Sequence, residues 1–209
     1  MSSASQAAGI PDRAFSAFFF DMDGTILTSI AAVERAWTAW GQKHGIDVRD
    51  HLADIHGMRA IDAIRNFGIP GIDVEQEAAE FLAAELADME GVAAIAGARE
   101  FLASLPSGRW AIVTSAHKEL ALRRLKAAGL PLPSVLVSNE DVPRGKPAPD
   151  CFLLAAERLG MPIAECLVFE DAAAGVDAAE TAGSSVVVIT AVHSHGHLPH
   201  LASLASYEG

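Results

Sequence analysis

Short apolar runs alternate along the chain with segments in which apolar residues recur at helical spacing. The runs are nearly continuous, as is typical of strands buried on both faces of a parallel sheet. We expect strands at Ala14–Phe20, Trp110–Thr114, Ser134–Val137, Cys166–Phe169 and Ser185–Ile189. Helical patterns follow the first four runs, at Ile30–His44, Glu119–Ala128, Asp150–Leu159 and Ala172–Ala182. Strands that alternate with helices predict an α/β fold made of strand–helix–strand units.

One connection is much longer than the others. About 90 residues separate Phe20 from Trp110, whereas the later units repeat about every 20–30 residues. Most of this connection has helical spacing, interrupted by a Gly-Ile-Pro-Gly turn signal. We therefore expect residues 28–91 to form a small helical domain, inserted into a core domain made of residues 1–27 and 92–209.

The overall composition limits the class of protein. Of 209 residues, 51% are apolar, and 27 acidic against 15 basic side chains give a net charge of −12. This charge repels nucleic acid and anionic membranes, and no apolar run reaches the roughly 18 residues that span a bilayer. Residues 1–13 lack the features of a signal peptide, and the two cysteines, Cys151 and Cys166, lie in apolar runs. We expect a cytoplasmic monomer with both thiols reduced and buried.

Polar residues follow four of the expected strands. The carboxyl ends of parallel strands meet at one edge of a sheet, where ligands bind. These residues are therefore expected to converge: Asp21, Asp23, Thr114, Ser115, Lys146, Glu170 and Asp171.

This set of side chains indicates phosphoryl transfer. Four carboxylates repel one another unless a cation lies among them, and hard oxygen ligands suit Mg²⁺. A lysine and a hydroxyl group supply contacts for phosphoryl oxygens. Asp21 and Asp23 point to different sides of an extended chain, so one can attack phosphorus while the other transfers protons. Each motif alone is more often a turn or a helix cap, and only their joint order favours chemistry.

The ordered motifs resemble those of the haloacid dehalogenase-like hydrolases. They are Asp21-x-Asp23-Gly-Thr, Thr114-Ser115, Lys146-Pro and Glu170-Asp171-x-x-x-Gly, and the resemblance extends from about Phe15 to Ile189. It implies a Rossmann-like parallel-sheet core sandwiched by helices, with an inserted small α-helical cap. The insertion is similar to the cap of the sugar- and polyol-phosphate phosphatases and β-phosphoglucomutase.

The resemblance also implies a role for each core residue. Asp21 is the implied nucleophile and Asp23 the acid and then base, while Thr114, Ser115 and Lys146 hold the phosphoryl group. Mg²⁺ is expected on the carboxylates of Asp21 and Asp171 and the backbone carbonyl of Asp23, with Glu170 adjacent or bridging through water. An acid at position 23 favours phosphate chemistry over dehalogenation.

Two features of the insertion are candidates for substrate contact. His56-Gly-Met-Arg59 resembles a cap motif of sugar- and glycerol-phosphate phosphatases. Arg59 is therefore expected to contact substrate, although a surface pair with Asp62 is the alternative. Trp37 and Trp40 share a helix face, which favours packing over a sugar-binding role.

Hydrolysis of a small sugar or polyol phosphate is the expected activity, with phosphoglucomutase-like transfer as the alternative. The mutase pattern Ser-Ala-Ser-Lys is replaced here by Thr114-Ser115-Ala116-His117, although Lys118 lies one residue on. A non-catalytic phosphate-binding protein is disfavoured because both Asp21 and Asp23 are present. Four histidines between His193 and His200 could bind Zn²⁺ or Ni²⁺ adventitiously, but a solvated segment is favoured.

Overall fold

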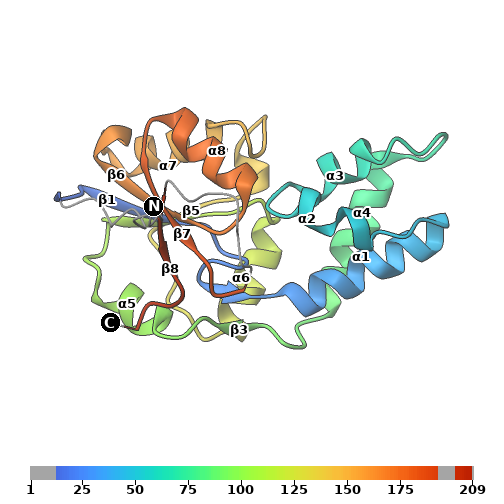
Figure 1. The fold of residues 1–209 in the computed structure, drawn as a ribbon, viewed down its shortest axis with the longest axis horizontal. Helices are drawn as coiled ribbons and strands as arrows, with labels where there is room; N and C mark the ends of the chain where they lie inside the picture. The colour runs from blue at the N-terminus through green and yellow to red at the C-terminus, as the bar shows by residue number, and fades with distance from the viewer. Residues whose placement is uncertain (1–12, 193–200, 209) are drawn as a thin grey trace, which may run out of the picture.

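Six parallel strands form the central sheet of the protein (Figure 1). The computed structural model describes residues 13–192 and 201–208. In spatial order the strands are β5 (Val135–Val137), β4 (Trp110–Val113), β1 (Ala17–Phe20), β6 (Cys166–Glu170), β7 (Ser185–Ile189) and β8 (Ala202–Leu204). The parallel sheet predicted from the apolar runs is confirmed.

The strands are buried because their side chains enter a hydrophobic core on each face. In β1, Phe19 and Phe20 point to opposite faces, and both are fully buried. Phe20 packs in the core with helices α5 (Ala98–Ser104) and α6 (Lys118–Ala127). Phe19 packs in the core with α7 (Asp150–Leu159) and α8 (Ala173–Ala182). Figure 1 shows α7 and α8 together on one side of the sheet, so the Rossmann-like layered fold is confirmed.

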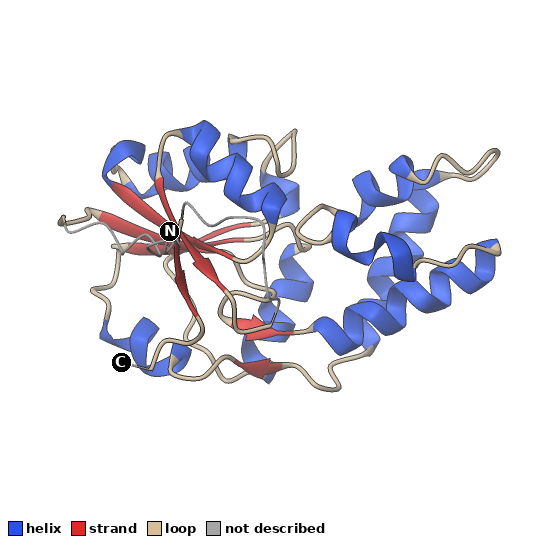
Figure 2. Cartoon of the chain, in the orientation of Figure 1, coloured by secondary structure: helices blue, strands red, loops and turns tan. Residues whose placement is uncertain are grey.

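The long insertion forms a separate helical lobe beyond one end of the sheet (Figure 2). It leaves the core at β2 (Leu27–Thr28) and returns at β3 (Ala93–Ala94), two strands that pair antiparallel. The helices between them are α1 (Ile30–His44), α2 (Leu52–Ile55), α3 (Ala60–Asn66) and α4 (Val74–Ala87). Trp37 and Trp40 are buried in the hydrophobic core of this lobe, so their predicted packing role is confirmed. We refer to residues 28–91 as the helical lobe.

Several boundaries differ from those expected. The first strand begins at Ala17 instead of Ala14, and the helix expected at Glu119–Ala128 spans Lys118–Ala127. The pair β2–β3 and strand β8 were not predicted, because strands of two or three residues carry too little pattern to be recognised. Short 3₁₀ turns occur at Arg49–His51, Asn139–Asp141 and Ile163–Glu165.

Other expectations have mixed outcomes. Both cysteines are free and buried, as predicted. Within residues 13–192 and 201–208, no helix is long and apolar enough to cross a membrane. The histidine cluster at 193–200 lies outside the described residues.

Candidate active site

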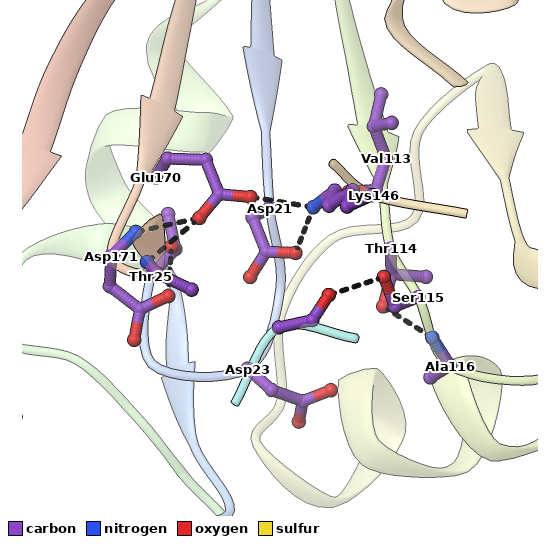
Figure 3. Close-up of polar contacts among 12 residues, drawn as sticks. Asp21, Asp23, Thr25, Val113, Thr114, Ser115, Ala116, Lys146, Glu170 and Asp171 are labelled. Carbon is purple, nitrogen blue, oxygen red and sulfur yellow. Dashed lines mark hydrogen bonds and ion pairs between the residues drawn. The ribbon is translucent and has the colours of Figure 1, made fainter. Parts of the chain in front are cut away.

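The Lys146 ammonium connects three strand ends at the carboxyl edge of the sheet (Figure 3). Its Nζ lies 2.6 Å from Oδ1 of Asp21, the first residue after β1, and 2.6 Å from Oε1 of Glu170, the last residue of β6. It also donates to the carbonyl of Val113, at the end of β4, over 3.1 Å. The predicted convergence of these strand ends therefore places Asp21, Lys146 and Glu170 in direct contact.

Glu170 is held in one orientation by the start of helix α8. Its Oε2 accepts hydrogen bonds from the backbone N–H groups of Asp171 at 2.9 Å and Ala172 at 3.0 Å. A Cβ atom at Gly175 would lie only 1.7 Å from Oε1 of the same side chain. The glycine of this motif therefore provides the space that the Glu170 carboxylate occupies.

Asp171 is packed against the turn that follows β1. Its Oδ1 accepts a hydrogen bond from the Thr25 hydroxyl at 3.2 Å. Gly24 has a φ of +93°, a conformation suited to glycine, and a Cβ atom there would lie 1.9 Å from Oδ2 of Asp171. This glycine thus serves both the turn and the close approach of the carboxylate.

Asp21, Glu170 and Asp171 form a group whose donor chemistry fits a divalent cation. All three are buried, and one carboxylate oxygen from each lies within 4.8 Å of the other two. Burial raises the pKa of Asp21 well above its ordinary value, and the charges of Glu170 and Asp171 raise it further, whereas Lys146 opposes this effect. Negative charge thus exceeds what Lys146 neutralises, which is the condition that a bound cation relieves.

Asp23 faces away from this carboxylate group. Its Oδ1 accepts a hydrogen bond from the Ser29 hydroxyl at 2.6 Å, and its Oδ2 lies 3.0 Å from Nη1 of Arg124 on α6. Arg124 is not among the site residues predicted from the sequence. Its position in the sequence could have indicated a buried arginine, because Arg124 lies on the same side of its helix as Leu120 and Leu125.

Thr114 and Ser115 lie directly after β4 but have different partners. The Thr114 hydroxyl accepts a hydrogen bond from the Ala116 N–H at 3.1 Å. The Ser115 hydroxyl donates to the carbonyl of Gly57, in the helical lobe, at 2.7 Å. Thr114 therefore belongs to the local turn, and Ser115 contacts the lobe.

The segment from His56 to Arg59 contacts the core at two further points. His56 Nε2 lies 2.8 Å from Oδ2 of Asp171. Burial alone would lower the pKa of His56, but the hydrogen bond and charge of Asp171 prevail and raise it to about 9. Arg59 forms the pair with Asp62 that was the alternative to substrate contact, and it also donates to the carbonyl of Pro143 at 3.2 Å. The lobe is thus closed against the core.

Comparisons with known proteins agree with this geometry. Residues 15–183 match the family profile of the haloacid dehalogenase-like hydrolases. Hexitol phosphatase A of Escherichia coli strain K12 is 44% identical, over 83% of this chain and 82% of its own length. Glycerol-1-phosphate phosphohydrolase 2 of Saccharomyces cerevisiae is 33% identical, over 83% of this chain and 74% of its own length. The crystal structure of a hydrolase from Pseudomonas syringae superposes with a TM-score of 0.80 at 29% identity, covering 91% of each chain. The four-motif resemblance is confirmed, and the chain belongs to the haloacid dehalogenase-like hydrolases.

Proposed function

We propose that this protein is a Mg²⁺-dependent phosphatase that hydrolyses a small sugar or polyol phosphate through an aspartyl-phosphate on Asp21. The observation that carries the proposal is the contact between Asp21, Lys146 and Glu170 at the end of β1. Assignment as a phosphoric monoester hydrolase is supported by the two phosphatase relatives, each more than 30% identical over most of the chain. Both are named for polyol phosphates, which is the substrate class proposed here.

Asp21 is placed to act as the nucleophile. It follows the central strand β1, and only its Oδ1 is engaged by Lys146. Attack by a carboxylate oxygen on phosphorus releases the alcohol and leaves an acyl phosphate on Asp21. Lys146, with the Thr114 hydroxyl nearby, would neutralise the charge on the phosphoryl oxygens during this step.

Asp23 is proposed as the general acid and then the general base. It would protonate the departing alkoxide and afterwards take a proton from the water that hydrolyses the acyl phosphate. Because Asp23 has Ser29 and Arg124 as partners, its environment differs from that of Asp21. Two carboxylates in different surroundings suit two different roles.

The carboxylates of Asp21 and Asp171 and the backbone carbonyl of Asp23 would hold Mg²⁺, with Glu170 adjacent. When bound, the ion supplies charge neutralisation for the phosphoryl group and the carboxylates. Glu170 also orients Lys146 through its 2.6 Å contact. This ligand set is the one implied by the resemblance to the haloacid dehalogenase-like hydrolases.

Residues 28–91 are proposed to act as a cap that closes over the substrate and excludes water. Ser115, His56 and Arg59 each form a contact between the lobe and the core. Arg59 is proposed to contact the part of the substrate that does not react, and His56 is proposed as a second substrate-binding residue. Two free buried thiols support the proposed cytoplasmic location.

Hydrolysis is favoured over mutase activity by the loop after β4. Where the mutase pattern has a lysine, this chain has His117, whose Nε2 lies 3.1 Å from Glu140. A carboxylate beside this position disfavours a second phosphate there. Incubation with β-glucose 1-phosphate and a bisphosphate primer should yield inorganic phosphate faster than glucose 6-phosphate; the reverse order would establish the mutase.

The function is tested by phosphate release from a panel of phosphorylated sugars and polyols, with Mg²⁺ or with EDTA. We expect turnover with Mg²⁺, none with EDTA, and none by Asp21→Asn. Acid quench of the wild-type enzyme during turnover of ³²P-labelled substrate should trap a labelled, hydroxylamine-sensitive acyl phosphate. Activity that survives in Asp21→Asn would exclude Asp21 as the nucleophile.

A further inference from the structure

Arg124 is a buried cation that links the two parts of the molecule. Its side chain is only 3% exposed, and it lies on α6, in the core. Nη1 donates to Oδ2 of Asp23 at 3.0 Å, and Nη2 donates to Oε1 of Glu85 at 2.8 Å. Glu85 belongs to α4 of the helical lobe. One guanidinium therefore bridges the proposed acid–base residue and the lobe.

Both carboxylate oxygens of Asp23 are engaged by side chains. Oδ2 accepts from Arg124, and Oδ1 accepts from the hydroxyl of Ser29, which immediately precedes helix α1. The planar guanidinium presents donors in a fixed arrangement, so it restricts the orientation of a carboxylate more than a flexible ammonium does. Asp23 is thus held in one rotational position.

The charges show that this arrangement is more than packing. The side chain of Arg124 is 3% exposed and that of Glu85 11%, so both charges are largely removed from water. Burial raises the pKa of Glu85, against the opposing effect of Arg124. An apolar side chain would fill this position without desolvating a charge. The structure nevertheless places an arginine here, with Nε buried and lacking a hydrogen-bond partner within the part of the chain that is described.

We propose that Arg124 is a positioning residue for Asp23, and that Glu85 anchors it so that Asp23 is aligned when the helical lobe is closed. The inference rests on the proposed function, because it concerns the residue assigned there as acid and base. Arg124 acts through Asp23, because its contact fixes the orientation of the carboxylate. Movement of the lobe away from the core would remove Glu85 and leave the guanidinium with one carboxylate fewer.

Leaving-group dependence isolates this role. Phenyl phosphate and p-nitrophenyl phosphate have similar size and shape, but phenolate is the stronger base and needs protonation by a general acid much more. The value of kcat/KM reports the step in which the leaving group departs. The ratio of kcat/KM for the two substrates is independent of the fraction of folded enzyme, because that fraction cancels.

The test measures this ratio in Arg124→Met, Arg124→Lys and Glu85→Gln. We expect Arg124→Met to lower kcat/KM for phenyl phosphate on the order of tenfold more than for p-nitrophenyl phosphate, as Asp23→Asn should also do. Arg124→Lys retains a buried positive charge and should change the ratio of kcat/KM in the same direction but less. Glu85→Gln removes the charge that anchors Arg124 and should also change the ratio in this direction. These two variants keep the test informative if Arg124→Met does not fold.

Arg123 provides a matched control on the same helix. It also contacts α4, through the carbonyl of Leu86 at 3.1 Å, but pairs with Glu119 instead of Asp23. Arg123→Met should leave the ratio unchanged. The proposal is overturned if the Arg124 and Glu85 variants lower kcat/KM equally for phenyl phosphate and p-nitrophenyl phosphate. It is also overturned if Arg123→Met changes the ratio as much as Arg124→Met does. Failure of the proposed function would be visible separately, as absent turnover in the wild type or turnover that persists in Asp21→Asn.

Discussion

The ammonium of Lys146 lies 2.6 Å from the carboxylate of Asp21, and only 2% of the lysine side chain is exposed. Burial alone would lower the pKa of Lys146, but the charges of Asp21 and Glu170 raise it, so the side chain remains a cation. This buried cation and the neighbouring His56 face a group of three carboxylates. We therefore expect the stability of the protein to depend on cations.

The first prediction follows from removal of this charge. Lys146→Met should lower the free energy of unfolding by about 3–5 kcal/mol in EDTA, because it leaves buried carboxylates without their ammonium partner. Addition of Mg²⁺ should restore part of this loss and should also stabilise the wild type, as a ligand of the folded state does. Urea unfolding with EDTA or Mg²⁺ measures both effects. Lys126→Met, at an exposed position on α6, is the control; a wild-type stability that does not respond to Mg²⁺ would argue against the cation site.

The second prediction concerns Arg59, which joins the helical lobe to the loop that precedes Lys146. Arg59→Ala should raise KM for a polyol phosphate about tenfold, while p-nitrophenyl phosphate, which lacks the polyol portion, should be affected much less. Steady-state kinetics on both substrates provide the measurement. Arg65→Ala is the matched control, since Arg65 pairs with Asp62 and Glu75 inside the lobe. An equal rise in KM for both substrates would count against substrate contact by Arg59.

The third prediction concerns the space at Gly175. Gly175→Ala would place a Cβ atom 1.7 Å from Oε1 of Glu170, so the carboxylate must move and its contact with Lys146 is lost. We expect a destabilisation of about 1–3 kcal/mol from overpacking, together with a large loss of turnover. Ala174→Gly, one residue earlier in α8, should cost about 1 kcal/mol through helix propensity and retain turnover. Thermal unfolding and phosphate release distinguish the two variants, and full activity in Gly175→Ala would contradict the prediction.

The fourth prediction is a pH dependence at Asp141. Burial would raise the pKa of this carboxyl, but hydrogen bonds from Arg158 and from the Ser138 N–H and hydroxyl lower it to about 2. In the folded protein the pKa of Asp141 lies below its ordinary value of 3.8. The contribution of Asp141 to stability is therefore complete above pH 3.8 and is lost as the pH falls through about 2. Asp141→Asn should therefore lower stability by about 1–2 kcal/mol at pH 7, the scale of a cap plus an ion pair.

This fourth prediction is checked by urea unfolding of both proteins at neutral pH and at successively more acidic pH. The difference between them should shrink as the pH falls. Asp177→Asn, at an exposed position on α8, is the control and should have little effect at any pH. A difference that stays constant into the acid range would exclude Asp141 as its source.

The core of the site could be predicted because Asp21 and Glu170 lie at the carboxyl ends of β1 and β6, and Lys146 lies in the loop after β5. Asp21, Lys146 and Glu170 are far apart in the sequence, yet parallel strands necessarily bring their carboxyl ends together. The apolar runs that mark the strands are short but almost continuous, so the polar residue that ends each one is conspicuous. The comparisons confirm the fold and the family, while the roles of individual residues remain predictions.

The contacts between the lobe and the core could not be predicted in the same way. Arg124 and Glu85 lie 39 residues apart on two helices, and they meet because α4 packs against α6. Periodicity identifies the buried side of each helix but not which helix lies opposite. Likewise, the motif containing His56 indicated a cap residue, but its contact with Asp171 depends on how the lobe is oriented.

The pairing of β2 with β3 has a consequence for how such a protein can change. Thr28 pairs with Ala93, so the two ends of the helical lobe are neighbours across an antiparallel ladder. From the viewpoint of the core, the whole insertion occupies the place of a hairpin loop. A short turn could join Thr28 to Ala93 without altering the sheet. We therefore expect the lobe to be an exchangeable module, whose helices can be lengthened, replaced or removed while the strand ends that carry the carboxylates keep their positions.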